Sequence, residues 1–153
     1  MNQAILSQDI QQDDAYVTAF RGRFSSLLRW EQLDAFWDTL KAQADDGWYI
    51  YHVGDDAPEY TSSAQQLLTF IEEINTLLRS EHQEEYCAIV YADDHEHPAF
   101  IKVFDPHNLG VSCGFSENPP LPGWVLSRIK PVNLENALRP TNNRLRWWQK
   151  IFE

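Results

Sequence analysis

Three stretches of the chain repeat apolar side chains every three or four positions, the spacing that places them on one face of an α-helix. They cover residues 15–28, 29–44 and 63–80. The third stretch has the most regular period and follows two serines, either of which can cap its N-terminus. The pattern predicts a helical hairpin, or one helix bent near Ser25–Ser26, followed by a further helix.

Five shorter stretches have the composition of β-strands, with many β-branched and aromatic residues. Residues 48–53, 86–92, 99–105 and 111–115 stand between turn residues, and residues 86–92 are continuously apolar, as a central strand would be. Residues 124–129 are expected to form an edge strand that the following proline ends.

The order of these elements, ααβαβββ(β)α, predicts an α+β fold. We expect a small mixed or antiparallel sheet of four to five strands, with the helices packed mainly on one face. A length of 153 residues suits a single domain over residues 1–153. Residues 1–12 are rich in Gln and Asp and are expected to fray, and residues 139–153 form a basic, aromatic C-terminal segment with helical spacing.

Charge is distributed unevenly along the chain. The formal net charge is −11, and residues 1–138 carry 8 basic and 22 acidic side chains, whereas residues 139–153 carry 4 basic and 1 acidic. A negative surface repels phosphate backbones, so we expect no nucleic-acid partner. A basic protein would be attracted by the long-range field, which mainly raises association rates.

The chain has no segment that predicts export or membrane insertion. No apolar run approaches the roughly 20 residues that cross a bilayer. The N-terminal stretch "MNQAILSQDIQQDD" lacks the features of a secretory signal. We therefore expect a cytoplasmic protein with no membrane partner. Cys87 and Cys113 agree with this, because two cysteines in a non-secreted chain are more often free thiols than a disulfide.

One stretch, "YADDHEHPAFIKVFDPHNLGVSCG" at residues 91–114, concentrates histidine, cysteine and acidic side chains. His95 and His97 could share a metal ion, with Asp93 as a further ligand. His107 cannot bind the same ion, because it lies in the turn at the other end of the expected strand 99–105, roughly 20 Å from His95 and His97. A metal-binding accessory protein that uses His95 and His97 is therefore one alternative function.

The same stretch offers another alternative, a small enzyme or ligand binder in which Cys113 is the nucleophile and His107 its base. Acidic surroundings would raise the pKa of the thiol, the opposite of what a nucleophile needs. The residues of "DDHEHP" and "DPHNLG" are ordinary turn residues, so two hairpin turns without a catalytic site are the favoured interpretation. No dinucleotide-binding, phosphate-loop, zinc-protease or nucleophile-elbow motif occurs, and we expect no cofactor.

The aromatic side chains indicate a binding surface. If Ile101 and Val103 face the helices, then Phe100, Lys102 and Phe104 face the other way and must be covered. We expect the cover to be the C-terminal segment or a partner protein. The residues predicted to contact a partner are Tyr49, Tyr51, Asp93, Asp94, Phe100, Phe104 and Trp124.

Together these features predict an acidic, cytoplasmic protein-binding module, inhibitor-like or accessory-like, rather than an enzyme. Its partner is expected to be another protein, and a basic one because of the charge. The C-terminal segment holds Trp and Arg, the typical anchors of interfaces. It can lie on its own chain or join two copies in a homodimer.

Overall fold

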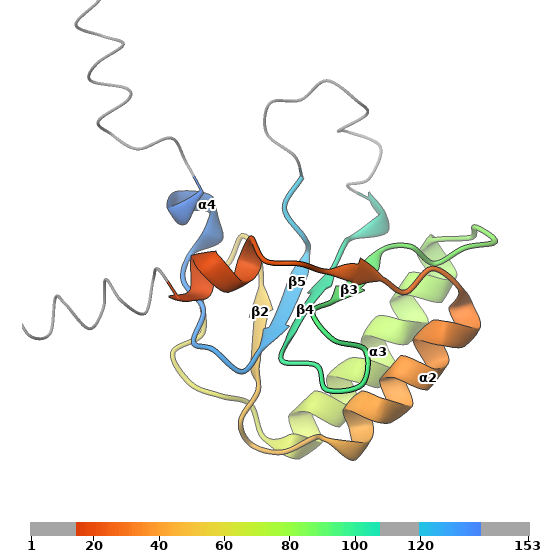
Figure 1. Ribbon diagram of the computed structural model, residues 1–153, viewed down its shortest axis with the longest axis horizontal. Coiled ribbons are helices and arrows are strands. Elements are labelled where there is room, and N and C mark those ends of the chain that lie inside the picture. Colours follow the sequence, from red (N-terminus) through yellow and green to blue (C-terminus); the bar gives the residue numbers. More distant parts are fainter. Residues whose placement is uncertain (1–14, 108–119, 139–153) are drawn as a thin grey trace, which may run out of the picture.

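A computed structural model of the chain describes residues 15–107 and 120–138. Its elements are β1 (Ser25–Ser26), α2 (Trp30–Ala42), β2 (Tyr49–His52), α3 (Ala64–Glu81), β3 (Val90–Ala92), β4 (Phe100–Val103), β5 (Trp124–Ser127) and α4 (Leu134–Ala137) (Figure 1). The predictions made for residues 1–12, 111–115 and 139–153 lie outside the described residues.

The five strands form one sheet in the order β1-β3-β4-β5-β2. All four pairs of neighbouring strands are antiparallel, which confirms the predicted α+β class and selects the antiparallel alternative. The prediction that β5 is an edge strand is wrong, because β5 pairs with β4 on one side and with β2 on the other. The neighbouring prolines fall outside Trp124–Ser127, where they remove no hydrogen bond from the ladders.

Helices α2 and α3 lie together on one face of the sheet (Figure 1). Ser63 caps α3 as predicted: its side chain accepts a hydrogen bond from the N–H of Gln66, whose own side chain accepts from the N–H of Ser63. Each helix buries one apolar stripe against the sheet. The buried residues are Leu33, Phe36, Trp37 and Leu40 in α2, and Leu67, Ile71, Ile74 and Leu78 in α3.

The first predicted helix is shorter than expected. Residues 15–20 are helical, but Ser25–Ser26 form strand β1, so the prediction of a helix over residues 15–28 is wrong in its second half. The N–H of Leu27 donates to the carbonyl oxygen of Val90 at 2.8 Å. The chain therefore satisfies its backbone groups on the edge of β3 instead of within another helical turn.

A second apolar cluster covers the opposite face of the sheet. Its buried members are Tyr16, Tyr51, Phe100, Val125 and Leu134. The rings of Tyr16, Phe20 and Phe24 lie with their centroids 5.1, 6.3 and 5.7 Å from that of Phe100. Residues 15–24 therefore cover Phe100, whereas we expected the C-terminal segment or a partner. The spacing of four between Tyr16 and Phe20 puts both rings on one side of the short helix.

The buried hydroxyl of Tyr16 gives a testable pH dependence. This hydroxyl has no hydrogen-bond partner of good geometry among the described residues, although the side chain of Ser127 lies near it. Burial, and then the proximity of Tyr51, raise the pKa of Tyr16 far above its ordinary value of 10.0. The stability linked to this proton is fully present below about pH 10 and is lost as the pH rises further, because only the unfolded chain releases the proton.

We therefore expect Tyr16→Phe to move the alkaline unfolding midpoint to higher pH. At neutral pH the substitution removes an unsatisfied hydroxyl and should raise the free energy of unfolding by up to about 1 kcal/mol. Circular dichroism recorded during a pH titration, together with urea unfolding at neutral pH, measures both effects. An alkaline midpoint identical to that of the wild type would contradict the conclusion that ionisation of Tyr16 destabilises the folded chain at high pH.

Candidate functional site

The hairpin between β3 and β4 contains the predicted acidic site, and Asp93 organises its backbone. Oδ1 of Asp93 accepts hydrogen bonds from the N–H groups of Asp94, Ala99 and Phe100 at 2.9, 3.0 and 3.1 Å. An aspartate that satisfies several backbone donors is the usual way to close a polar turn. The role visible for Asp93 is therefore to hold the hairpin together.

Asp94 and His95 are held by further contacts of the same hairpin. Oδ1 of Asp94 accepts from the N–H groups of Glu96 and His97 at 2.8 and 3.0 Å. The bond from His97, followed by that from Glu96, lowers the pKa of the Asp94 carboxyl. Nε2 of His95 lies 3.0 Å from Oγ and 3.1 Å from the carbonyl oxygen of Ser25, which ties the hairpin to β1. In the part of the chain that the structure describes, no group of three His, Cys, Asp or Glu side chains could hold a metal ion.

The structure describes only one residue of the predicted nucleophile pair, His107. Nε2 of His107 lies 3.0 Å from Oε2 of Glu81, so the imidazole contacts the C-terminal end of α3. Cys113 lies outside the described residues, and its pairing with His107 stays a prediction. Cys87 is a buried free thiol whose pKa is raised by burial, as expected for a core side chain.

Two of the aromatic residues predicted to contact a partner lie in the interior. The side chain of Tyr51 is 1 % exposed and that of Phe100 is 2 % exposed. The hydroxyl of Tyr51 accepts a hydrogen bond from the N–H of Leu134 at 3.2 Å, which anchors α4 to the sheet. In this structure both rings stabilise the second apolar cluster and neither presents a surface to a partner.

The other three predicted aromatic residues, Tyr49, Phe104 and Trp124, are half-buried. Trp124 stacks on the imidazole of His52, with ring centroids 5.6 Å apart and an interplanar angle of 25°. His52 is in turn paired with Asp55 at 2.9 Å. These rings reach the surface only in part, so an exposed aromatic patch is not the most prominent feature of the described residues.

Arginine side chains near the helices are occupied by contacts within the chain. Arg79 of α3 pairs with Asp34 of α2 and lies over the ring of Trp30, at 4.9 Å from its centroid. Arg128 pairs with Asp45 and lies over the buried ring of Trp48. The side-chain bond from Arg128 is the largest of the effects that lower the pKa of Asp45.

On the opposite face of the sheet, the amine of Lys102 is also held by contacts within the chain. Its Nζ donates to the carbonyl oxygen of Phe20 at 2.6 Å and lies 3.9 Å from the ring centroids of both Phe20 and Phe24. Burial lowers the pKa of Lys102 to about 8, while the ring faces and the carbonyl favour the protonated form. The amine thus fastens residues 20–24 to the sheet and is withdrawn from the surface.

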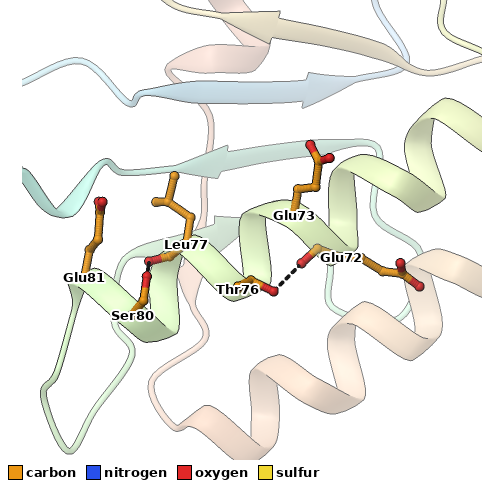
Figure 2. Close-up of a pocket in the computed structure, with 6 residues that line it drawn as sticks. All are labelled: Glu72, Glu73, Thr76, Leu77, Ser80 and Glu81. Atoms are coloured by element: carbon orange, nitrogen blue, oxygen red, sulfur yellow. Dashed lines mark hydrogen bonds between the residues drawn. The ribbon is translucent and has the colours of Figure 1, made fainter.

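The exposed side of α3 carries carboxylates and forms a shallow trough of about 460 Å³. Its lining residues are Glu72, Glu73, Thr76, Leu77, Ser80 and Glu81. Figure 2 shows Glu73, Leu77 and Glu81 extending from the helix in the same direction. We call this surface the α3 trough.

Two carboxylates of the α3 trough, those of Glu72 and Glu73, are left to bind a ligand strongly, because Glu81 already contacts His107. The hydroxyls of Thr76 and Ser80 donate to the carbonyl oxygens of Glu72 and Leu77 within the helix, each at 3.0 Å. Leu77 is partly exposed and supplies an apolar contact between the acidic side chains. No lysine or arginine lines the trough among the described residues. The arrangement suits a cationic group with an apolar neighbour.

The α3 trough was not predicted as a site. Its signal was present in the sequence, because the spacing of the buried residues turns Glu72 and Glu73 toward solvent. The missing information was that Arg79, which is close to them in sequence, is turned toward α2 and Asp34 instead.

Comparisons with known proteins do not assign this chain to a family. No family model, no curated protein and no solved structure matches this chain. Among the described helices, none has the combined length and apolarity needed to cross a bilayer. The class that the fold and the charges define is therefore an α+β protein with an acidic helical layer.

Proposed function

We propose that this chain is an acidic protein-binding module of the cytoplasm that recognises a basic protein. One observation carries the proposal: among the described residues no lysine or arginine lines the trough that holds Glu72 and Glu73, and Arg79 of the same helix is paired with Asp34. The third carboxylate, Glu81, contacts the imidazole of His107. A surface that leaves its negative charges uncompensated is complementary to a positive one.

Two physical effects would act together on such a partner. The net charge of −11 attracts a basic surface from a distance and accelerates its encounter, in a way that salt weakens over a Debye length of about 10 Å at 0.1 M. At contact, the partly exposed Leu77 and the half-buried rings of Phe104 and Trp124 supply apolar area. Charge would then set the rate and specificity, and apolar contact would set the lifetime.

The residues predicted to contact a partner divide into two groups. Tyr49, Phe104, Trp124, Asp93 and Asp94 reach the surface at least in part and remain in the proposal as contact residues. The two buried rings described above do not belong to the contact surface. The carboxylates of the α3 trough are added as the electrostatic centre.

Charge reversal in the α3 trough tests the proposal. The double variant Glu72→Arg, Glu73→Arg, used as bait in cell lysate, should lose a basic protein that the wild type captures. The matched control is Glu31→Arg, Asp38→Arg, which makes the same change in net charge on exposed positions of α2. The control should keep most of the binding if α3 is the contact surface.

The captured protein is then purified and its affinity measured by calorimetry at low and high salt. We expect the affinity of the wild type to fall at least about tenfold between 0.05 and 0.5 M salt, as for interfaces steered by charge. Binding that is insensitive to salt, or equal for wild type and trough variant, would contradict the proposed function.

A further inference from the structure

Two exposed apolar side chains lie together at one end of the molecule, where the start of α2 meets the loop that follows α3 (Figure 1). Leu28 is 48 % exposed and Tyr86 is 54 % exposed, and only one other large hydrophobic side chain stands exposed among the described residues. The N–H of Cys87 donates to the carbonyl oxygen of Leu28 at 2.8 Å, which brings the neighbouring Tyr86 beside Leu28. We call Leu28 and Tyr86 the end patch.

The backbone at Ala88 turns Tyr86 away from the core. Residues three apart in an extended chain face opposite sides, but Cys87 and Val90 are both buried in the core cluster beneath the helices. The alternation is broken between them at Ala88, whose φ of 55° lies in the left-handed region that a residue with a Cβ enters at a cost. Such strained residues recur at functional sites. Here the strain directs Cys87 inward and leaves the ring of Tyr86 outside.

The loop that carries Tyr86 is held in place on both sides. Nε1 of Trp30 donates to the carbonyl oxygen of Glu84 at 2.9 Å, and Nε2 of His82 lies 3.0 Å from the carbonyl oxygen of Cys87. A surface that is already fixed loses little conformational entropy when a partner binds. The end patch is therefore preorganised for contact, unlike a single apolar side chain on a free loop.

The charges around the end patch indicate the chemistry of its partner. The sequence neighbours of Leu28 and Tyr86, residues 28–31 and 83–86, carry three exposed acidic side chains and one exposed basic side chain: Glu31, Glu84, Glu85 and Arg29. The local balance has the same sign as the net charge of −11. Interfaces commonly place an apolar centre inside a polar rim, and charge on the rim selects a partner of the opposite sign.

We infer that the end patch is the apolar anchor site for a basic protein segment. The segment places a large apolar or aromatic side chain against Leu28 and Tyr86, and its lysines or arginines meet Glu84 and Glu85. The inference rests on the proposed function, because it names the surface that holds the same basic partner once charge has attracted it. Tyrosine is among the residues that carry most of the binding energy at interfaces, so Tyr86 is the expected main contributor.

A peptide selection on the full chain tests the inference. Random twelve-residue peptides displayed on phage are selected on the wild-type protein, and the enriched peptides are synthesised and their affinities measured by fluorescence anisotropy. We expect the enriched peptides to combine a positive net charge with at least one large apolar side chain. The variant Leu28→Ser, Tyr86→Ser should bind them at least about tenfold more weakly. The variant Glu84→Gln, Glu85→Gln should bind them at least about threefold more weakly at low salt.

Two controls separate a lost contact from a changed fold. Tyr60→Ser removes a ring that is 81 % exposed in the loop before α3, and this variant should bind the peptides like the wild type. The urea midpoint of Leu28→Ser, Tyr86→Ser should stay within about 0.5 M of the wild type, as for other surface substitutions. A larger loss would show that the chain itself covers the end patch, and would overturn the inference.

Three further results would overturn it: no enriched peptide, enriched peptides that are neutral or acidic, or peptides that bind the Leu28→Ser, Tyr86→Ser variant as tightly as the wild type. A wild-type dimer that the same variant dissociates would also overturn it, because a second copy would then occupy the end patch. Sedimentation equilibrium measures this.

The proposed function fails separately. If the peptides ignore the end patch but lose affinity for Glu72→Arg, Glu73→Arg, the basic partner stands and the anchor site is wrong. If the peptides depend on the end patch and bind that trough variant like the wild type, the anchor site stands and the α3 trough is not the electrostatic centre.

Discussion

Replacing Phe100 with alanine is expected to lower the free energy of unfolding by about 3–5 kcal/mol. The ring is 2 % exposed and lies at the centre of the second apolar cluster. It contacts the rings of Tyr16, Phe20 and Phe24. These side chains hold residues 15–24, here called the N-terminal segment, to the sheet. Removal of the Phe100 ring creates a cavity and also releases that segment. Urea unfolding followed by circular dichroism measures the loss.

Local release of the N-terminal segment has its own readout. Arg21 and Arg23 are exposed trypsin sites within the segment. Cleavage there should be faster in Phe100→Ala than in the wild type under native conditions. The matched control is Phe104→Ala, which removes a half-buried ring of the same strand region and should cost clearly less. Equal losses for the two variants would contradict the central role of Phe100.

Replacing Asp93 with alanine is expected to lower the free energy of unfolding by about 2–3 kcal/mol. The substitution leaves three backbone N–H groups without their shared acceptor, those of Asp94, Ala99 and Phe100. Asp93→Asn keeps an oxygen at the same position and should lose less than half as much. Thermal and urea unfolding of the two variants measure the difference. If asparagine is as destabilising as alanine, the negative charge of Asp93 is what matters and the hydrogen-bond assignment is wrong.

The sequence predicted the parts of the fold that depend on local periodicity. Helices α2 and α3 bury the residues that their spacing selects, and Ser63 caps α3 by a bond made within one turn. These interactions are local, so the sequence states them directly.

The errors concern interactions between distant parts of the chain. Strand β1 exists because Ser25–Ser26 pairs with Tyr91 and Ala92, and nothing near the two serines in sequence announces that partner. In the same way, β5 becomes central only because Tyr49 and Ser127 meet in the register of the sheet. The apolar spacing of the first predicted helix continues into β1, and spacing alone cannot distinguish the two.

For the candidate site, too, the sequence predicts local features but not contacts between distant residues. The sequence places the carboxylates of the α3 trough outward, but the ion pairs that engage the arginines join residues far apart, such as Arg128 and Asp45. The burial of Tyr51 and Phe100 also depends on a distant segment, since residues of the N-terminal helix and α4 cover them. A binding surface is therefore predicted less well than the helix that carries it.

The order of the strands determines when the chain can finish folding. The three central strands β3, β4 and β5 follow one another in sequence, whereas the outer strands β1 and β2 both come from the N-terminal half. During synthesis β2 emerges long before β5, its only partner in the sheet among the described strands, so its backbone groups and the rings beside it stay unpaired for most of translation. A nascent chain halted before Trp124 would expose that edge, which makes it the form most in need of a chaperone.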